Sequence, residues 1–420
     1  MAVNVLVGLQ WGDEGKGKIV DVLTPQMDAV CRFQGGPNAG HTLEFNNKKY
    51  VLHTIPSGIF REDVVNIIGN GVVIDPVIFQ EEVEKLEASD KNIRERLFIS
   101  KRATLIMPTH RILDAANEAA KGKNKIGSTL KGIGPTYTDK VSRNALRVGD
   151  VVGEYMDKYN RAKQRHLDIL DKLHQFEYDL KEYEGKWHKA VEFLNSFKLI
   201  DTEHLINNML KENKEILAEG AQGSLLDIDF GTYPFVTSSS TLSSGACTGL
   251  GIAPSKVKEV TGIFKAYCTR VGMGPFTTEL ECETGERIRQ EGHEFGATTG
   301  RNRRCGWLDL VALNYTIMLN GVTQLAMMKA DVLNEFDTVK VAVGYEIDGK
   351  ITKEFPYELT DEVKPVYKEF PGWKIDVDGV LKTGKLPKEL KEYIAFIEDE
   401  TGVKIKILSL GPDRKATLNL

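Results

Sequence analysis

The chain has 420 residues, of which 41% are hydrophobic and 27% are charged, and its formal net charge is −5. This length is enough to bury a large core in one or two domains, and the acidic balance argues against a nucleic-acid-binding protein, which usually has a net basic domain. The five cysteines are widely spaced and include no C-x-x-C pair, which disfavours a disulfide framework or a zinc site. Without a signal-like start or an apolar run of about 20 residues, the sequence predicts a soluble, cytoplasmic protein that does not bind membranes.

Short apolar runs alternate with helical patterns along the chain. The expected strands are residues 3–9, 29–33, 64–68, 97–100, 216–219, 257–268, 322–327 and 403–409, and the expected helices include residues 75–87, 109–121 and 308–319. Buried strands that alternate with helices predict an α/β fold with a large, mainly parallel central sheet and helices on both faces. Because no linker interrupts the pattern, we expect a single large catalytic domain over residues 1–420, with a charged helical segment at about 150–200 packed outside the sheet.

Residues 12–18 (GDEGKGK) lie between an apolar run and a stretch compatible with a helix. A strand, a glycine-rich turn and a helix start cradle phosphate, because free backbone N–H groups point at the anion and glycines let the backbone approach it. The spacing fits G-x-x-x-x-G-K, but Ile19 replaces the Ser or Thr that normally binds Mg²⁺, which makes Asp13 and Glu14 candidates for the missing oxygen ligand. The alternative is that Asp13 only caps the helix, but the two neighbouring lysines favour phosphate chemistry.

Residues 34–42 (QGGPNAGHT) form a second glycine-rich segment after an expected strand. Glycines let the backbone approach a ligand, Asn38 can both donate and accept, and His41 can move a proton near neutral pH. The alternative is a structural loop with a surface histidine. Because the segment lies one strand after the phosphate loop, we interpret it as the other wall of one site.

Residues 328–331 (MKAD) follow an expected strand and are similar to the N-K-x-D motif that reads guanine. Guanine offers N1–H and its 2-amino group to one carboxylate, and the wrong base would leave that buried carboxylate unpaired. A plain surface turn is the alternative, since K-x-D is common by chance. Its place at a strand end in a chain with a phosphate loop favours a guanine site at Lys329 and Asp331.

Residues 297–304 (ATTGRNRR) place three arginines and two hydroxyls around one glycine. Arginine binds carboxylate and phosphate in a bidentate manner, so the segment is a candidate anion receptor, and a solvated basic loop is the alternative. Two further clusters are candidates for completing a nucleotide pocket: Gly127-Ser128-Thr129 with Arg143, and Gln222 with Thr237-Ser238-Ser239.

Six segments in order resemble one known family. They are QWGDEGKGK (10–18), GGPNAGHT (35–42), GIGPTYTDK (132–140), EGAQG (219–223), GTYPFVTSS (231–239) and TTGRNRRCGWLDL (298–310). Together they resemble the adenylosuccinate synthetase family over nearly the whole chain. The resemblance implies a large, mainly parallel sheet with a P-loop-like GTP site. It also implies a GTP-dependent ligase that forms adenylosuccinate from IMP and L-aspartate through 6-phosphoryl-IMP, releasing GDP and phosphate, as the first committed step of AMP synthesis from IMP.

The resemblance further implies roles for individual residues. Asp13 would be the general base that takes the proton from N1 of IMP, and His41 would be the general acid that steadies the charge between O6 and the phosphate. Mg²⁺ would be held by Asp13 and the carbonyl of Gly40. Arg143 would reach the IMP site from the other subunit of a homodimer. One departure is Asn302, which interrupts the consecutive arginines that the family often carries.

The implied binding residues form three sets. Those for IMP are Asp13, Glu14, Gly15, Lys16, Asn38, Ala39, Gly40, His41, Thr129, Arg143, Gln222, Thr237 and Arg301. Those for L-aspartate are Ala297, Thr298, Thr299, Gly300, Arg301, Asn302 and Arg303. Those for GTP are Gly12, Asp13, Glu14, Gly15, Lys16, Gly17, Lys18, Gly40, His41, Thr42, Arg303, Lys329, Ala330, Asp331, Ser409, Leu410 and Gly411.

Two other classes of function fit part of these motifs. A regulatory GTPase switch would combine the phosphate loop with K-x-D, but Ile19, His41 and the arginine-rich segment argue against it. A purine sensor would keep the pocket without the chemistry, and the presence of both Asp13 and His41 weakens that interpretation. A switch would hydrolyse GTP without IMP or aspartate, whereas the synthetase requires both.

Overall fold

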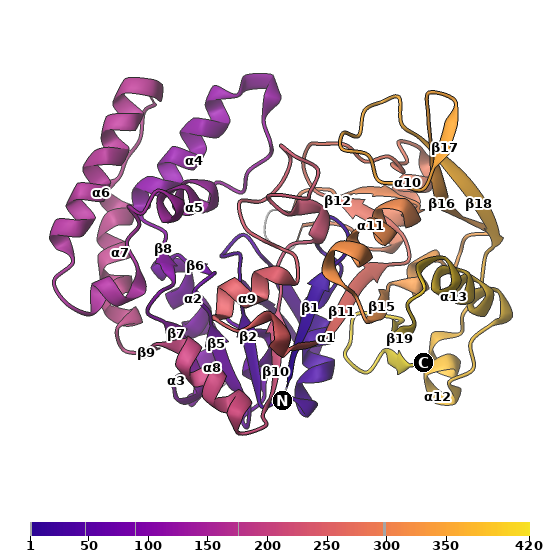
Figure 1. The fold of residues 1–420 in the computed structure, drawn as a ribbon, viewed down its shortest axis with the longest axis horizontal. Coiled ribbons are helices and arrows are strands. Elements are labelled where there is room, and N and C mark those ends of the chain that lie inside the picture. The colour runs from indigo at the N-terminus through magenta and orange to yellow at the C-terminus, as the bar shows by residue number, and fades with distance from the viewer. Residues whose placement is uncertain (1, 47, 89, 175, 297–299) are drawn as a thin grey trace.

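The centre of the molecule is a ten-stranded sheet (Figure 1). The computed structural model describes residues 2–46, 48–88, 90–174, 176–296 and 300–420. The strands lie in the order β20-β19-β15-β11-β1-β10-β2-β5-β7-β9, and every neighbouring pair is parallel except β19 with β20. The expected α/β fold with a large, mainly parallel sheet is therefore confirmed.

Each expected strand lies in this sheet. Its members are β1 (Ala2–Gly8), β2 (Ala29–Arg32), β5 (Val65–Ile68), β7 (Leu97–Ser100), β9 (Lys198–Ile200), β10 (Glu215–Glu219), β11 (Val257–Lys265), β15 (Gln324–Met328), β19 (Ile405–Ser409) and β20 (Thr417–Asn419). The single strand expected over residues 257–268 was wrong at its end. The chain leaves the sheet after Lys265, and β12 (Cys268–Arg270) pairs instead with β13 (Arg304–Gly306), which brings the arginine-rich segment toward the sheet.

Side chains that alternate along the strands build a core on each face of the sheet. Val3 and Val5 of β1 pack into the larger core, whereas Leu6 packs into the core on the opposite face with Ile19 of α1 (Lys16–Leu23). The helices that contribute to the larger core include α8 (Thr202–Lys211), α9 (Ser244–Leu250), α10 (Glu283–Glu291), α11 (Leu310–Asn320) and α13 (Lys388–Thr401). Helices thus cover both faces, as expected.

A group of helices stands beside the β7 end of the sheet, at the left of Figure 1. It comprises α2 (Pro76–Glu87), α3 (Ile93–Arg96), α4 (Pro108–Ala120), α5 (Ile133–Val141), α6 (Met156–Ile169) and α7 (Lys181–Leu194). Its core contains Phe79 of α2, Tyr159 of α6 and the fully buried Trp187 of α7. The indole N–H of Trp187 donates to the carbonyl of Ile106 at 2.7 Å, which satisfies the one polar group of this ring. The charged segment at about 150–200 therefore supplies α6 and α7.

Several small elements outside the central sheet were not expected from the sequence. They are the hairpin of β3 (His41–Phe45) with β4 (Lys48–Leu52), and the sheet in which β16 (Thr338–Ile347) pairs with β17 (Lys350–Thr352) and β18 (Lys364–Pro371). The remaining short elements are β6 (Val73–Ile74), β8 (Thr104–Leu105), β14 (Leu308–Asp309) and α12 (Val377–Thr383). The helix expected over residues 308–319 begins at Leu310, because Asp309 caps it by accepting the N–H of Ala312 at 3.1 Å.

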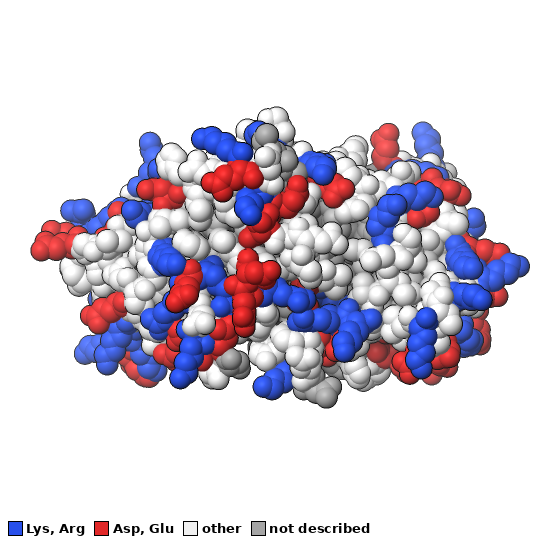
Figure 2. Space-filling model, turned by 90° about the horizontal axis from the view of Figure 1, so that it is seen from below, with Lys and Arg blue, Asp and Glu red and all other residues white. Residues whose placement is uncertain are grey.

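The surface carries charges of both signs. On the face shown in Figure 2, Lys and Arg side chains are interspersed with Asp and Glu side chains. Among the described residues, no helix has the length and apolar character needed to cross a membrane.

Candidate functional site

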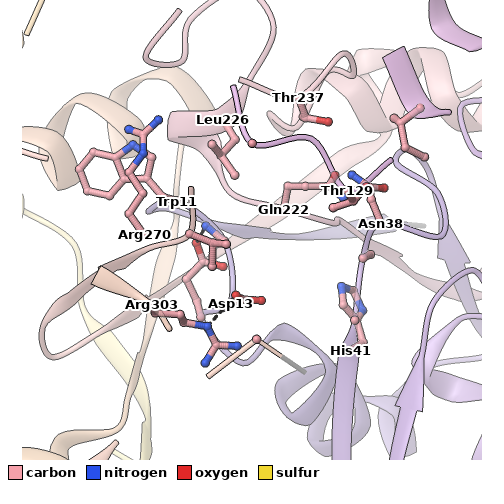
Figure 3. A pocket seen from close by; sticks show the side chains of 18 of the residues that line it. Trp11, Asp13, Asn38, His41, Thr129, Gln222, Leu226, Thr237, Arg270 and Arg303 are labelled. Carbon is pink, nitrogen blue, oxygen red and sulfur yellow. Dashed lines mark hydrogen bonds and ion pairs between the residues drawn. The ribbon is translucent and has the colours of Figure 1, made fainter. Parts of the chain in front are cut away.

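A large cavity of about 1090 Å³ opens at the carboxyl ends of the parallel strands. Its walls come from the loops that follow β1, β2, β10, β15 and β19, together with the segment after β12 and part of α4 and α5. Ligands of open α/β sheets bind at this edge, because the loops after parallel strands converge there. In Figure 3, Asp13 and His41 face one open space, and Asn38, Thr129 and Gln222 border it.

The glycine-rich loop after β1 forms the floor of this cavity. Its backbone is left-handed at Gly12 (φ 87°), Asp13 (φ 61°) and Gly15 (φ 97°), and α1 begins at Lys16 with Gly15 as its N-cap. Asp13 therefore does not cap the helix, which rules out the alternative interpretation of this residue. A Cβ added to Gly17 would lie 3.0 Å from Cβ of His41, so the first turn of α1 packs directly against β3.

The charged residues of this loop divide into those that shape it and those that face the cavity. Glu14 is fully buried, accepts the N–H groups of Gln10 at 3.1 Å and Gly12 at 2.9 Å, and pairs with Lys16 at 2.6 Å. Its carboxylate is occupied in holding the turn, which leaves Asp13 as the better candidate for a metal ligand. Asp13 itself accepts from Nε of Arg303 at 2.8 Å.

Lys18 bonds to the segment that follows β19. Its ammonium donates to Oγ of Ser409 at 2.7 Å and to the carbonyls of Gly411 at 2.7 Å and Ala416 at 2.9 Å. Burial lowers the pKa of Lys18 to about 8, against the opposing charges of nearby aspartates. Lys18 thus ties the segment after β19 to the phosphate loop, although it still lines the cavity.

The electrostatics of Asp13 favour its ionised form. Burial alone would raise the pKa of this carboxyl, but the positive charges of Arg303, Lys265 and Lys16 outweigh burial and hold the pKa below its usual range. The left-handed backbone at Asp13 is also unusual for a residue with a side chain. Gln222 (φ 57°) and Lys329 (φ 60°) share this conformation, and such residues concentrate at functional sites.

His41 faces Asp13 across the cavity and is oriented by a buried carboxylate. Its Nδ1 lies 2.5 Å from Oε1 of Glu219, and Glu219 also accepts the N–H of Ser57 at 2.8 Å and its hydroxyl at 2.6 Å. Burial, with a contribution from the positive charge of Arg32, lowers the pKa of His41 to about 4. The ring is therefore neutral at pH 7, with its Nδ1 proton donated to Glu219 and a lone pair on Nε2.

Buried polar atoms that line the cavity have no hydrogen-bond partner among the described residues. They are Oδ1 of Asn38, Nε2 of His41, both amide atoms of Gln222 and Oδ1 of Asp331. Leaving such groups unpaired costs about 1–3 kcal/mol each, so a native chain keeps them where a ligand supplies the partner. These four residues are all members of the sets predicted from the sequence.

The structure places most predicted residues at the cavity but leaves some elsewhere. Those that line it are Gly12, Asp13, Glu14, Gly15, Lys16, Gly17, Lys18, Asn38, Ala39, Gly40, His41, Thr42, Thr129, Gln222, Thr237, Arg303, Lys329, Asp331, Ser409 and Gly411. Those described but not lining it are Arg143, Gly300, Arg301, Asn302, Ala330 and Leu410. The predicted residues Ala297, Thr298 and Thr299 lie outside the described residues.

Two arginines that were expected to bind IMP, Arg143 and Arg301, do not line the cavity. Arg143 is exposed just after the end of α5. Arg301 is also exposed, and its guanidinium donates to the carbonyl of Gly127 at 3.1 Å, in the loop that carries Thr129. Arg301 thus already connects the arginine-rich segment with the loop expected to bind IMP.

Sequence reasoning missed two carboxylates that organise the site. Glu219 orients His41. The sequence could have indicated this residue, because it is a charged residue at the end of the apolar strand β10, inside the EGAQG segment. Glu294 is fully buried and binds Nη1 of Arg303 at 2.6 Å. No spacing or composition marks Glu294, because its partners come from distant parts of the chain.

The sequence matches one family over nearly its whole length. Residues 5–418 match the profile of the family described as adenylosuccinate synthetase. The adenylosuccinate synthetase of Parabacteroides distasonis is 62% identical over 418 residues, which cover 100% of this chain and 99% of that protein. The adenylosuccinate synthetase of Porphyromonas gingivalis is 62% identical over 416 residues, which cover 99% of this chain and 98% of that protein.

Solved structures give the same result. The fully ligated adenylosuccinate synthetase from Plasmodium falciparum matches with a TM-score of 0.93 at 38% sequence identity, and the match covers 100% of both chains. A succinoaminodeoxyadenylate synthetase of cyanophage S-2L, bound to dGMP and dATP, matches with a TM-score of 0.65 at 20% identity over 100% of this chain and 95% of that chain. The second likeness shows a shared fold.

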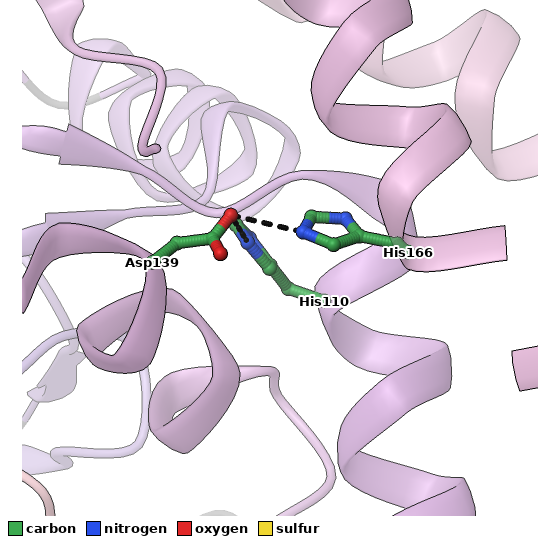
Figure 4. Close-up of side chains that lie close together, drawn as sticks. All are labelled: His110, Asp139 and His166. Atoms are coloured by element: carbon green, nitrogen blue, oxygen red, sulfur yellow. Dashed lines mark hydrogen bonds and ion pairs between the residues drawn. The ribbon is translucent and has the colours of Figure 1, made fainter. Parts of the chain in front are cut away.

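A second group of titratable side chains, His110, Asp139 and His166, has the composition of a metal site (Figure 4). Oδ2 of Asp139 lies 3.1 Å from Nε2 of His110 and 2.9 Å from Nε2 of His166, and it also accepts from Arg165 at 3.0 Å. The N–H of Met107 donates to Nδ1 of His110 at 3.0 Å, so the proton of the neutral ring is on Nε2. A protonated Nε2 cannot ligate a metal, and we interpret the group as a hydrogen-bonded cluster that joins α4, α5 and α6.

We expect His110 to stay neutral, with its proton on Nε2, down to about pH 4. Burial, together with the charge of His166, lowers the pKa of His110 to about 4, although Asp139 opposes the shift. An unfolded histidine titrates near 6.5, so between about pH 6.5 and pH 4 the unfolded chain binds more protons and stability falls as the pH falls. Nitrogen NMR of histidine-labelled protein measures both the tautomer and the titration.

The His110→Gln variant identifies the signal in that spectrum, because glutamine keeps a donor near the position of Nε2. A His110 resonance that titrates near pH 6.5, or that carries its proton on Nδ1, would contradict this assignment and would reopen the metal interpretation.

Proposed function

This chain belongs to the adenylosuccinate synthetase family, and we propose that its large cavity binds IMP, GTP and L-aspartate together and performs both steps of the ligation there. The chain is a GTP-dependent ligase that forms adenylosuccinate, GDP and phosphate in AMP biosynthesis. The observation that carries the proposal is the set of buried, unpartnered polar atoms that face the cavity within the described part of the chain. A volume of about 1090 Å³ is at the upper end of the usual range for ligand sites, which suits more than one ligand.

In the first step, Asp13 takes the proton from N1 of IMP, and O6 attacks the γ-phosphorus of GTP. The O6–phosphorus bond forms, the bond from phosphorus to the bridging oxygen breaks, and GDP leaves with that electron pair. The lowered pKa of Asp13 keeps the carboxylate ionised at neutral pH, and it becomes a stronger base when a ligand draws Arg303 away from it. Arg303 holds one oxygen of Asp13, and the carboxylates of L-aspartate compete for this guanidinium when they bind.

His41 stabilises the charge that moves onto the phosphate during this step. Its Nε2 is buried and faces the cavity, while Glu219 fixes the ring through Nδ1. In the free protein the low pKa of about 4 keeps Nε2 unprotonated. A bound phosphate brings negative charge next to Nε2, which favours the protonated ring and turns His41 into a general acid.

In the second step, the amine of L-aspartate attacks C6, phosphate leaves with the electrons of the C6–O6 bond, and the proton lost by the amine passes to the departing phosphate. Phosphorylation of O6 makes this possible because phosphate is a far better leaving group than an oxide. Arg301 and Arg303 supply the positive charge that the two substrate carboxylates need, and both stand near the cavity. Asn302 between them is exposed.

The purine ring and ribose of IMP are proposed to lie against Asn38, Thr129, Gln222 and Thr237, which all line the cavity. Asn38 and Gln222 supply amide groups whose hydrogen-bonding atoms are unpaired within the described residues. An amide can donate to and accept from the edge of a purine, which suits the neutral base better than a charged side chain.

Guanine is proposed to bind at the end of β15. Oδ1 of Asp331 is buried and has no partner in the described part of the chain, and burial raises the pKa of this carboxyl. N1–H and the 2-amino group of guanine would satisfy the carboxylate and favour its ionised form. Lys329 lies beside it, and the segment from Ser409 to Gly411, held by Lys18, closes the same side of the cavity.

Mg²⁺ fits the donors that Asp13 and Gly40 offer. A carboxylate and a backbone carbonyl are the oxygen ligands that this ion prefers, with the remaining positions taken by water and phosphate. Both residues line the cavity, and Glu14 is already committed to the loop backbone. When bound, the ion would neutralise charge on the phosphates of GTP.

A homodimer would complete the IMP site with Arg143 of the second chain. Arg143 is exposed and does not line the cavity of its own chain. Its guanidinium is therefore accessible to a second subunit. Sedimentation of the purified chain should therefore give a particle of twice its mass of 46.8 kDa, and a monomer at working concentration would remove this part of the proposal.

Synthesis should require IMP, GTP, L-aspartate and Mg²⁺ together, and Asp13→Ala and His41→Ala should each abolish it. General acid–base groups contribute about 10²- to 10⁴-fold to a rate, so the loss in each variant should be at least of this order. Adenylosuccinate formation followed by ultraviolet absorbance, with each component omitted in turn, measures the effect.

Matched controls for these variants are Asp63→Ala and His204→Ala, which change exposed residues outside the cavity and should keep full activity. Retained turnover in Asp13→Ala or His41→Ala would remove that residue from the mechanism. Binding of GTP and IMP without product in the unchanged chain would instead support a purine sensor.

Asp331→Asn should relax the preference for GTP. The asparagine amide no longer accepts both donors of guanine, but it can donate to the 2-oxo group of xanthine, so discrimination against XTP and ITP should fall by about 10-fold or more. The measurement is kcat/KM with GTP, ITP and XTP. Asp337→Asn, at a carboxylate that is 98% exposed, is the matched control, and unchanged discrimination in Asp331→Asn would overturn the guanine assignment.

A further inference from the structure

Glu294 is a carboxylate near the cavity that binds three cations. It is fully buried and accepts from four side chains: Lys265 at 2.9 Å, Arg303 at 2.6 Å, Lys329 at 2.9 Å and the hydroxyl of Tyr267 at 2.5 Å. We call these five residues the Glu294 cluster. Burial would raise the pKa of Glu294, but the three cations outweigh burial and hold its pKa far below the usual range. The carboxylate is therefore ionised at neutral pH.

The cluster is built from segments that are far apart in the sequence. Lys265 ends β11, Lys329 follows β15, and Glu294 lies in the segment between α10 and β13. Glu294 and Arg303 are also joined through the backbone, since the N–H of Arg303 donates to the carbonyl of Glu294 at 2.9 Å. Glu294 thus fixes the start and Arg303 the end of the segment proposed to receive L-aspartate.

The cations of this cluster also serve the two proposed ligand sites. Lys329 belongs to the proposed guanine motif. Its ammonium donates to Glu294 and, at 2.6 Å, to the carbonyl of Gly292. Arg303 is divided between Glu294, through Nη1, and Asp13, through Nε at 2.8 Å. The carboxylate of Glu294 therefore binds a residue of the proposed guanine site, Lys329, and a residue of the proposed aspartate site, Arg303. Through Arg303 it is also linked to Asp13.

We propose that Glu294 is a positioning residue that couples the guanine site to the aspartate site, because it holds Lys329 of the first and Arg303 of the second. The coupling rests on the proposed roles of these two residues. When guanine draws Lys329 away, Glu294 keeps fewer cations and attracts Arg303 more strongly, since charge interactions in a buried site are weakly screened. Arg303 then releases Asp13, which frees the base and presents the guanidinium to the substrate carboxylates.

The coupling is measurable at equilibrium with GDP, which has no γ-phosphate to transfer. Calorimetric titration of GDP in the presence of IMP, with and without saturating L-aspartate, gives the factor by which one ligand changes the affinity of the other. Coupling between sites is typically about 5- to 150-fold and is reciprocal. We expect a factor in this range for the unchanged chain and a factor near one for Glu294→Gln, with IMP affinity retained in both.

Because Glu294→Gln removes a buried charge and could prevent folding, a second variant that changes no charge is also measured. Tyr267→Phe removes only one hydrogen bond to Glu294, and we expect it to fold and to lose part of the coupling. Glu283→Gln, at an exposed residue in the first turn of α10, is the matched control and should keep the full factor. Glu294→Asp keeps the charge and should recover part of the coupling lost in Glu294→Gln.

The outcomes separate this inference from the proposed function. If the unchanged chain and Glu294→Gln show the same coupling factor, Glu294 does not connect the sites, and the ligase proposal is unaffected. If the unchanged chain shows a factor of one while binding all ligands, the coupling itself is absent and the inference is overturned. Failure of the unchanged chain to bind GDP or L-aspartate at all would overturn both proposals.

Discussion

Parallel pairing of β1 with β10 and β11 is the constraint on which the site depends. The register that sets Leu6 opposite Glu219 and Gly8 opposite Ile263 brings three strand ends to one edge of the sheet. Each following loop then delivers its polar groups to the same cavity: the glycine-rich loop after β1, the segment with Gln222 after β10 and, through β12, the segment with Arg270. Buried parallel strands tolerate almost no slippage, because a shift of one residue would move every side chain to the wrong face.

The second organising feature is the distribution of charge around the cavity. Glu14, Glu219 and Glu294 are all fully buried, and each carboxylate is satisfied by backbone N–H groups, a hydroxyl or cations. Each of the three carboxylates is bonded to other groups of the described chain. They hold Lys16, His41 and Arg303 in place, as a set of fixed charges that needs little reorganisation when the charge of the phosphates arrives. Asp13 differs because its surroundings include both a cation and the open cavity.

Some elements of the fold and the site could be predicted from the sequence, and others could not. The turn at residues 12–18 was placed correctly, because an apolar strand, glycines at fixed spacing and a helix start are local signals. The strand expected over residues 257–268 was too long, since the apolar run continues into a segment that pairs antiparallel with residues 304–306. The sheet of β16, β17 and β18 went unpredicted, and both Glu219 and Glu294 were assigned no role. The bonds that join Lys18 to the segment after β19 were not predicted either, because Lys18 and Ser409 are 391 positions apart.

The sequence by itself determined the order of strands and glycine-rich turns, the family and the residue types that face the ligands, because these depend on spacing over a few residues. The tertiary structure alone decided which carboxylate orients His41, which cations share Glu294 and which polar atoms stay unpaired. His41 and Glu219 are 178 positions apart, and Asp13 and Arg303 are 290 apart. Contacts at such separation follow from sheet order and register, and no local pattern of residues encodes them.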